Sequence, residues 1–418
     1  MPDLNTPLSA PPISVRPTSV RARLIGIDIA RFIAILGMVT EHVWPRVPGE
    51  PWSIRDLAAG NASTLFAVLG GVSIILATQS AVDRGHPRGA YRSLIARSLA
   101  IIVIGLTLGL LPAPAINVLV YFGVAMLFAV PFLRAPSWLI GTAVAVLAVG
   151  GGILTAWSRI GMDALQEYAS ISWLDLGQPL SALRGVLVTG TYPVVTWLTY
   201  LLIGMLVGRS LLRQRTARTP ITIASIGLLA AAAAMIIATA LYTLVGRDAL
   251  LALTPGLARQ LPPGFTVDAV FRSAGMGAAA FRWPDLLLDS PHTGTLFDIG
   301  RGAGVALLVI GITTLLSKPL SVPVLAPIRR AGAAPLTSYT FHLIVLTVLL
   351  VAAGTGQDTT WTYGPVAFGA NLGAILVVGG CLALLRRRGP LETLVSAVSR
   401  SAAGGGRRRE DVSLKPHR

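Results

Sequence analysis

Long apolar stretches alternate with short connectors that contain arginine along most of the chain. Each stretch is close to the roughly 17–25 residues that an α-helix needs to cross the hydrocarbon core of a bilayer, where a helix satisfies its own backbone hydrogen bonds. The pattern therefore predicts an all-α fold, a polytopic integral membrane bundle of about ten helices. The predicted spans cover residues 25–43, 62–78, 93–111, 115–133, 138–157, 192–208, 220–245, 298–316, 333–353 and 364–385.

The basic residues are divided unequally between the two sets of alternating connectors. The set that includes both chain ends holds 24 of the 34 Lys and Arg residues, whereas the opposite set holds nine, over longer loops. Because Lys and Arg are retained on the cytoplasmic side, both termini are predicted to lie in the cytoplasm. The predicted location is the plasma membrane, as a multi-pass protein. The long loops at about 158–191 and 246–297, and a shorter one at 44–61, are then external.

Composition supports this division of the chain into a membrane domain and two tails. Hydrophobic residues make up 53% of the chain and charged residues 12%, too few to coat a soluble globule. We expect a disordered cytosolic tail at 1–24, a transmembrane domain at 25–388 and a basic cytosolic tail at 389–418. The net charge of +16 lies in connectors and tails, which favours contact with membrane lipid and argues against nucleic acid.

Few residue types are available for metal or redox chemistry. Cys381 is the only cysteine, which excludes a disulfide framework and a cysteine-based metal site. No glycine-rich nucleotide loop and no His-x-x-x-His pattern is present, so no metal is predicted. The many Arg, Ala and Gly residues beside only two Lys are typical of a GC-rich bacterial genome.

The first predicted span carries polar residues along one face. Asp28 and Arg31 lie three residues apart and can form an ion pair. His42 lies eleven residues after Arg31, about 1100° and about 16 Å along the helix, and so returns to within about 20° of the same face. Glu41 lies about 100° away from this stripe. Charged groups at membrane depth are costly, so the stripe either fixes helix packing or forms a functional site.

The functional interpretation assigns different tasks to the two ends of the stripe. Arg31, held by Asp28, would bind an anionic group that arrives from the cytosol. His42, near the external end, would act as a base, since a neutral imidazole can take a hydroxyl proton near pH 7.

Several segments resemble known transmembrane acyltransferases. The segment from Asp28 to Met38 resembles the opening of the YeiB-like family and of heparan-α-glucosaminide N-acetyltransferase domains. The spacing of Arg31 and His42, with ten residues between them, is similar to the Arg-x10-His motif of acyltransferase family three. Further similar segments follow in order at 56–73, 192–209, 291–295, 335–342 and 388–392.

The resemblance implies that domain 25–388 transfers an acyl group from cytosolic acyl-CoA to an external acceptor, a glycan or glycolipid. Acyl-CoA would be the donor substrate, with no permanently bound cofactor. Asp28, Arg31 and His42 are the predicted catalytic residues. One departure matters: heparan acetyltransferases place Asn at the position of His42 and a catalytic His about ten residues later, but residues 46–60 contain no His. Either His42 takes the catalytic role or this branch does not catalyse that reaction.

Other residues are predicted to bind the two substrates. Arg92 and Arg97 would hold the phosphates of CoA, although the positive-inside bias also explains them. Tyr339 and His342, one turn apart, would line the CoA channel or else hydrogen-bond between helices.

On the external side, His292 in the 246–297 loop and Trp44 at the end of the first span are predicted to bind the acceptor. The sequence leaves two rival functions open, a permease whose solute path follows the polar stripe, and a non-catalytic membrane scaffold. It also leaves open the acyl group, the acceptor and the oligomeric state, including a homo-oligomer.

Overall fold

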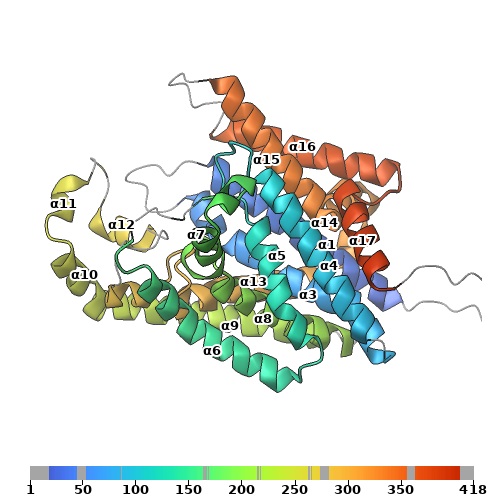
Figure 1. Ribbon diagram of the computed structural model, residues 1–418, viewed down its shortest axis with the longest axis horizontal. Helices are drawn as coiled ribbons and strands as arrows, with labels where there is room; N and C mark the ends of the chain where they lie inside the picture. The colour runs from blue at the N-terminus through green and yellow to red at the C-terminus, as the bar shows by residue number, and fades with distance from the viewer. Residues whose placement is uncertain are drawn as a thin grey trace, which may run out of the picture.

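The computed structural model describes residues 18–44, 53–85, 87–162, 167, 169–213, 216, 218–261, 264, 266–273, 282–354 and 363–404. Every regular element in these ranges is helical, which confirms the all-α class (Figure 1). The longer helices are α1 (Thr18–Val43), α3 (Asn61–Asp83), α4 (Pro87–Leu108), α5 (Leu119–Ala129), α6 (Ser137–Ser158), α8 (Val194–Arg213), α9 (Arg218–Leu241), α13 (Leu296–Leu315), α15 (Pro335–Ala353), α16 (Pro365–Leu384) and α17 (Pro390–Ala402).

Short helices and helical turns connect them. The short α-helices are α2 (Ile54–Ala58), α7 (Pro179–Arg184), α10 (Arg247–Leu253), α11 (Leu257–Gln260), α12 (Val267–Ser273) and α14 (Ala326–Ala333). The turns of 3-10 or π geometry are η1 (Val130–Leu133), η2 (Trp173–Gly177), η3 (Gly185–Thr189), η4 (Tyr242–Gly246), η5 (Trp283–Leu287), η6 (Pro319–Ser321) and η7 (Pro323–Leu325).

Within the described ranges, eight helical segments are long and apolar enough to cross a membrane. They are Ile54–Asp83, Pro87–Leu108, Ser137–Ser158, Val194–Arg213, Arg218–Leu253, Leu296–Leu315, Pro335–Ala353 and Pro365–Leu384. Each coincides with a predicted span, so a multi-pass membrane protein is confirmed. The other two predicted spans correspond to α1, which carries Asp28, Arg31 and Glu41, and to the short segment Leu119–Leu133. A total of about ten spans therefore stays a prediction.

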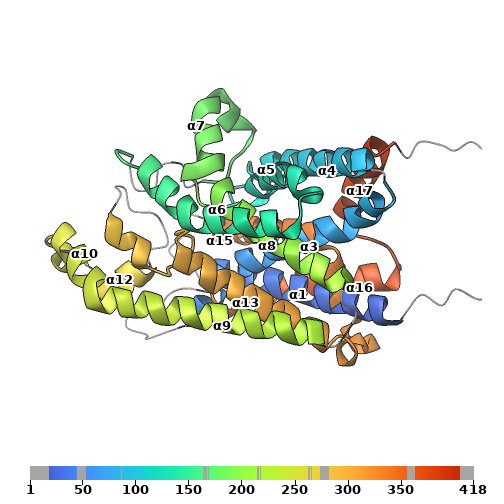
Figure 2. The same cartoon turned by 90° about the horizontal axis from the view of Figure 1, so that it is seen from below.

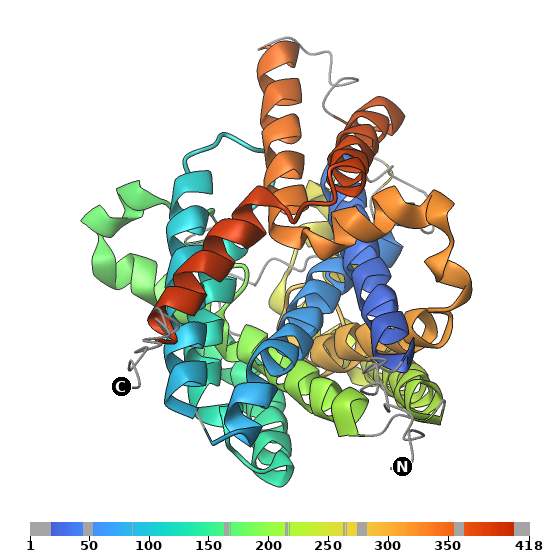
Figure 3. The same cartoon turned by 90° about the vertical axis from the view of Figure 1, so that its right-hand side faces the viewer.

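The two ends of the described chain lie at the same end of the bundle. The beginning of α1 and the end of α17 both face the viewer in Figure 3. The short helices α10 to α12 lie at the opposite end (Figures 1 and 2). This placement agrees with an even number of crossings, whereas the side of the membrane on which the termini lie stays a prediction.

Glycines let two central helices approach closely. Gly71 of α3 faces Gly204 of α8, and a Cβ atom added to Gly204 would lie 1.9 Å from the carbonyl oxygen of Val68. Any larger residue would therefore force the two backbones apart. Small residues at such contacts are how membrane helices gain packing energy without a hydrophobic driving force between them.

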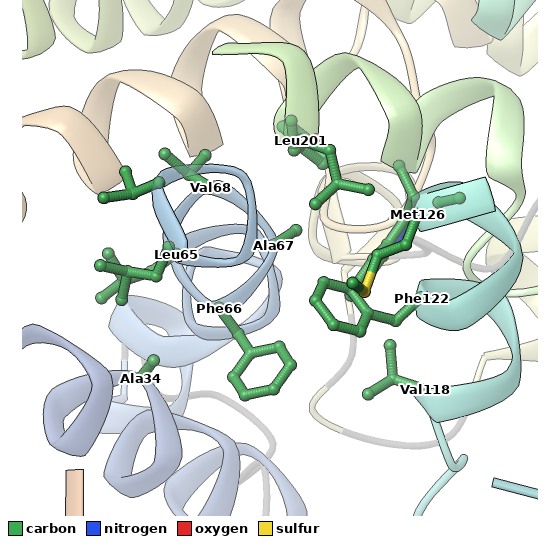
Figure 4. Close-up of a cluster of buried hydrophobic side chains, with 14 of the residues drawn as sticks. Ala34, Leu65, Phe66, Ala67, Val68, Val118, Phe122, Met126 and Leu201 are labelled. Carbon is green, nitrogen blue, oxygen red and sulfur yellow. The ribbon is translucent and has the colours of Figure 1, made fainter. Parts of the chain in front are cut away.

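Larger apolar side chains fill the space between α3 and α5. Phe122 and Met126 of α5 point toward α3, which contributes Phe66, and Leu201 of α8 lies above the gap between these two helices (Figure 4). All four side chains are buried. This cluster packs the bundle beside the site described below.

Both predicted tails contain helical structure where they meet the membrane domain. Helix α1 begins at Thr18, inside the tail predicted at 1–24. Helix α17 occupies Pro390–Ala402 within the tail predicted at 389–418, and it packs against α4. Sequence reasoning missed α17 because 13 residues are too few to span a bilayer. The remainder of both predicted tails, 1–17 and 405–418, lies outside the described residues.

Candidate active site

The predicted ion pair of α1 is present and reaches a second helix. Nη1 of Arg31 donates to Oδ1 of Asp28 at 2.7 Å. Nη2 of Arg31 donates to the hydroxyl of Ser73 on α3 at 2.9 Å, and that hydroxyl donates to the carbonyl of Leu69. The two charged side chains retain 17% and 23% of their exposure. The guanidinium is therefore held in a fixed position between α1 and α3.

Arg31 faces a cavity of about 330 Å³. The volume is at the lower end of the range found for small-molecule sites. The wall is mostly apolar, with Arg31, Arg97 of α4 and Glu392 of α17 as its charged residues. The complete lining is Arg31, Phe66, Leu69, Gly70, Ser73, Ile74, Leu76, Ala77, Arg97, Ile101, Leu119, Phe122, Met126, Ala333, Pro335, Leu336, Glu392 and Val395.

Glu392 attaches α17 to the beginning of α15. Its Oε1 accepts hydrogen bonds from the backbone N–H groups of Leu336 at 2.7 Å and Thr337 at 3.1 Å. Its Oε2 accepts from the hydroxyl of Thr337 at 2.6 Å. The first N–H groups of a helix have no partner within the helix, and a negative charge there is favourable. Glu392 thus caps α15 and fixes α17 as one wall of the cavity.

At the other end of the stripe, His42 is hydrogen-bonded to a second histidine. Nδ1 of His42 lies 2.9 Å from Nε2 of His342 on α15, with the two rings parallel to within 2°. Nδ1 of His342 lies 2.8 Å from Oδ1 of Asn371 on α16. Both His342 and Asn371 are fully buried. Three helices therefore meet in one hydrogen-bonded chain of side chains.

Tyr339 and His342 lie next to this cavity, not among the residues that line it. His42 does not line this cavity either, and the predicted CoA-channel role of Tyr339 and His342 stays a prediction. The buried ring of Tyr339 lies 6.4 Å from that of His342 and 6.2 Å from that of Phe66, which does line the cavity. The Phe66 and Tyr339 rings thus separate the cavity from the histidines. The cavity beside Arg31 therefore does not itself extend to His42.

The two predicted phosphate-binding arginines of α4 differ in position. Arg97 is half-buried and lines the cavity, whereas Arg92 is exposed and lies outside the lining. Arg97 follows Arg92 by five positions, which places the two side chains about 140° apart around the helix. The structure therefore brings Arg97, but not Arg92, to Arg31.

His292 reaches the C-terminal end of α1 through an ion pair that the sequence did not predict. Nε2 of His292 lies 3.0 Å from Oε1 of Glu41, the residue that precedes His42. Burial alone would lower the pKa of His292, but the hydrogen bond and negative charge of Glu41 outweigh it and raise that pKa. The ring of Tyr192 packs nearly perpendicular to the imidazole, with the two ring centroids 5.3 Å apart. A loop residue about 250 positions away is therefore placed beside the stripe.

Trp44 is also held at this end of α1. Its ring meets that of Phe368 on α16 edge to face, with the centroids 5.9 Å apart. The N–H of Gly364 donates to the carbonyl of Val43 at 2.7 Å. These contacts place Trp44 near His42, and the predicted acceptor-binding roles of Trp44 and His292 stay predictions.

Sequence reasoning missed Ser73, Glu41, Asn371 and Glu392. A signal existed for Asn371, because it is the only amide or charged side chain in the apolar helix Pro365–Leu384. A polar residue at that depth needs a partner. Nothing in the sequence indicated that Glu392 would cap a helix more than 50 positions earlier.

Comparison with known proteins gives a family for the chain. No curated protein matches it significantly. The family model described as heparan-alpha-glucosaminide N-acetyltransferase, catalytic, matches residues 23–251, which is more than half of the chain. The match includes Asp28, Arg31 and His42, and ends before His292 and His342. The chain therefore belongs to the heparan-α-glucosaminide N-acetyltransferase catalytic-domain family, and to acetyltransferase-type membrane enzymes.

Proposed function

We propose that this protein transfers an acyl group from cytosolic acyl-CoA to a hydroxyl or amine of a glycan or glycolipid on the external face of the plasma membrane. One observation carries the proposal beyond the family match. Helix α1 presents a guanidinium to a cavity near one end and an imidazole near the other. An enzyme that joins substrates from opposite sides of a membrane needs this separation of donor binding from chemistry.

The cavity suits the donor. Arg31 and Arg97 supply two positive charges, and guanidinium groups pair well with phosphate oxygens. The apolar remainder of the wall suits an acyl chain or the narrow pantetheine arm of CoA. For the thioester to reach His42, the rings of Phe66 and Tyr339 must turn aside, a side-chain movement of the kind that closes many active sites.

The chemistry at the external end needs a base. In the proposed step, His42 takes the proton from the acceptor hydroxyl or amine while that oxygen or nitrogen attacks the thioester carbonyl carbon. The carbon–sulfur bond breaks, and the CoA thiolate leaves and takes the proton back from His42. In the two-step alternative, Nε2 of His42 attacks the thioester carbonyl carbon and CoA leaves as the thiolate. The acceptor then attacks the acyl-imidazole, the bond from Nε2 to the acyl carbon breaks, and the acceptor proton passes to the thiolate. His292, Glu41 and Trp44 lie where an acceptor would approach.

The test is transfer of radiolabelled acetyl from acetyl-CoA by the purified protein, with release of CoA thiol measured against a panel of sugars and glycolipids. We expect transfer in the native protein and a kcat at least about 100-fold lower in His42→Ala, since a general base contributes that much or more. His42→Gln should be equally inactive, because an amide hydrogen-bonds but does not accept a proton at neutral pH. Size-exclusion chromatography checks that both variants are folded.

Two results would overturn the proposal. One is full transfer activity in both His42 variants. The other is movement of a solute across proteoliposome membranes with no consumption of acyl-CoA, which would support the permease alternative.

A further inference from the structure

The orientation of the Asn371 amide is fixed by its own helix. Nδ2 of Asn371 donates to the carbonyl oxygen of Ala367 at 2.9 Å. A carbonyl oxygen can only accept hydrogen bonds, so the NH₂ group must face Ala367. The amide oxygen then faces the His342 ring. The buried amide therefore presents an acceptor, and no donor, to His342.

This acceptor determines which nitrogen of His342 carries a proton. Nδ1 of His342 lies 2.8 Å from Oδ1 of Asn371 and must donate to it. The ring is fully buried, and its hydrogen-bond partners in the described chain are an amide and an imidazole, neither of them negative. Charging it there would be costly, so the ring is neutral. A neutral ring protonated at Nδ1 has a free lone pair at Nε2.

The same reasoning determines which nitrogen of His42 carries a proton. Nε2 of His342 lies 2.9 Å from Nδ1 of His42, and because it offers a lone pair, Nδ1 of His42 carries the hydrogen. Nε2 of His42 is left without a proton, and it has no hydrogen-bond partner among the described residues. We propose that Asn371 and His342 are positioning residues that hold His42 in the tautomer whose Nε2 lone pair is available to the substrates. This inference rests on the proposed function of His42.

The hydrogen bonds from Asn371 through His342 to His42 also stabilise the positive charge that forms on His42 during transfer. When Nε2 of His42 takes a proton, the ring becomes positive and its Nδ1–H bond to His342 becomes charge-assisted. His342 can accept that bond only while Asn371 keeps its proton on Nδ1. With Asn371 lost, His342 can adopt the opposite tautomer, and His42 can then carry its proton on Nε2. Such a ring cannot act as a base toward the acceptor.

The first experiment reads the tautomer directly. Protein labelled with ¹⁵N-histidine in lipid nanodiscs has only five histidines to assign by NMR, and His42→Gln identifies the His42 signals. In the native protein we expect a protonated Nδ1 and an unprotonated Nε2 on His42. In Asn371→Leu, which has a similar size but no acceptor, this tautomer should be lost. An Nε2-protonated His42 in the native protein would overturn the inference without any variant.

The second experiment measures transfer. Asn371→Leu should lower kcat by about 10-fold or more and leave the KM for acyl-CoA unchanged. The loss should stay smaller than the roughly 10⁴-fold loss of kcat that the wrong histidine tautomer causes in a serine protease triad. Asn371→Asp keeps an acceptor oxygen facing His342 and, above the pH at which the new carboxylate would let His342 take a second proton, should retain the His42 tautomer and most of kcat. An Asn371→Leu protein with native kcat and native His42 signals would contradict the inference.

A matched control separates positioning from folding. Asn117 is also a buried amide, bonded to the carbonyl of Gly105 at 2.7 Å and to the N–H of Leu119 at 3.1 Å. Asn117→Leu should leave the His42 nitrogen signals unchanged even where it lowers stability. The two proposals fail separately: an active His42→Ala defeats the proposed function, whereas the nitrogen signals alone decide the role of Asn371.

Discussion

The two ends of the polar stripe on α1 are built differently. Near Arg31, long charged side chains from three helices surround a cavity of about 330 Å³. Near His42, two rings and an amide form a hydrogen-bonded chain in which two of the three members are fully buried. The first end has room for a ligand, and the second has fixed geometry. The difference teaches that binding and chemistry can be assigned to opposite ends of one helix and tested apart.

A substitution that changes only the cavity end of α1 tests this comparison most directly. Arg97→Ala removes a cavity-facing positive charge and should weaken CoA binding by about 10-fold or more, because hydrogen bonds to charged groups contribute about 1.5–3 kcal/mol. The kcat at saturating donor should change little. The dissociation constant can be measured by titration calorimetry and compared with steady-state kinetics.

Arg92→Ala is the matched variant on the same helix. Arg92 is exposed and does not reach the cavity, so its removal should leave CoA binding near the native value. Equal weakening in the two variants would contradict the assignment of the cavity to the donor. It would favour the interpretation in which the arginines of α4 serve only to orient the protein in the membrane.

A smaller effect, on stability, is expected from removing Glu392, which caps α15 and holds α17 beside the cavity. Glu392→Ala leaves the N–H groups of Leu336 and Thr337 without their acceptor, which should cost about 1–3 kcal/mol. The apparent melting temperature in detergent should fall, and less so in Glu392→Gln, which keeps one acceptor oxygen. Asp83→Ala, at the exposed end of α3, is the control and should change it little. An unchanged melting temperature in Glu392→Ala would show that α17 is not anchored by this contact.

The smallest effect concerns the pH dependence of the pair between His292 and Glu41. Because the pKa of His292 is raised in the folded protein, the stabilisation from its pair with Glu41 is fully present below pH 6.5, the ordinary value. It is lost as the pH rises through the higher folded pKa. The stability difference between the native protein and His292→Gln should therefore be largest near pH 6 and shrink above pH 6.5. A difference that grows with pH would contradict the ion pair.

Much of the fold could be predicted because its determinants are local. Apolar runs of membrane length appear directly in the sequence, and eight of them became helices of the expected kind. The pair of Asp28 and Arg31 follows from helical spacing alone. The short helix α17 could not be predicted in this way, because its burial depends on α4 and on the first turn of α15.

The site was predicted less completely, because helical periodicity places side chains on a face without naming the helix that covers it. His42 meets a residue 300 positions later, and Glu41, off the stripe, meets His292. The position of Arg92 away from the cavity depends on how α4 is rotated in the bundle, which its own sequence does not specify. Contacts between distant segments require the assembled structure.

The glycine contact between α3 and α8 limits how the molecule can admit a substrate. At Gly71 and Gly204 the two backbones are in contact, so at this point no side chain lies between the helices whose rotation would let them separate. We expect α3 and α8 to stay together while other helices of the bundle shift. Widening of the cavity beside Arg31 is therefore expected at its opposite wall, formed by α4, α15 and α17, which takes no part in this glycine contact. The donor would enter by displacing that wall.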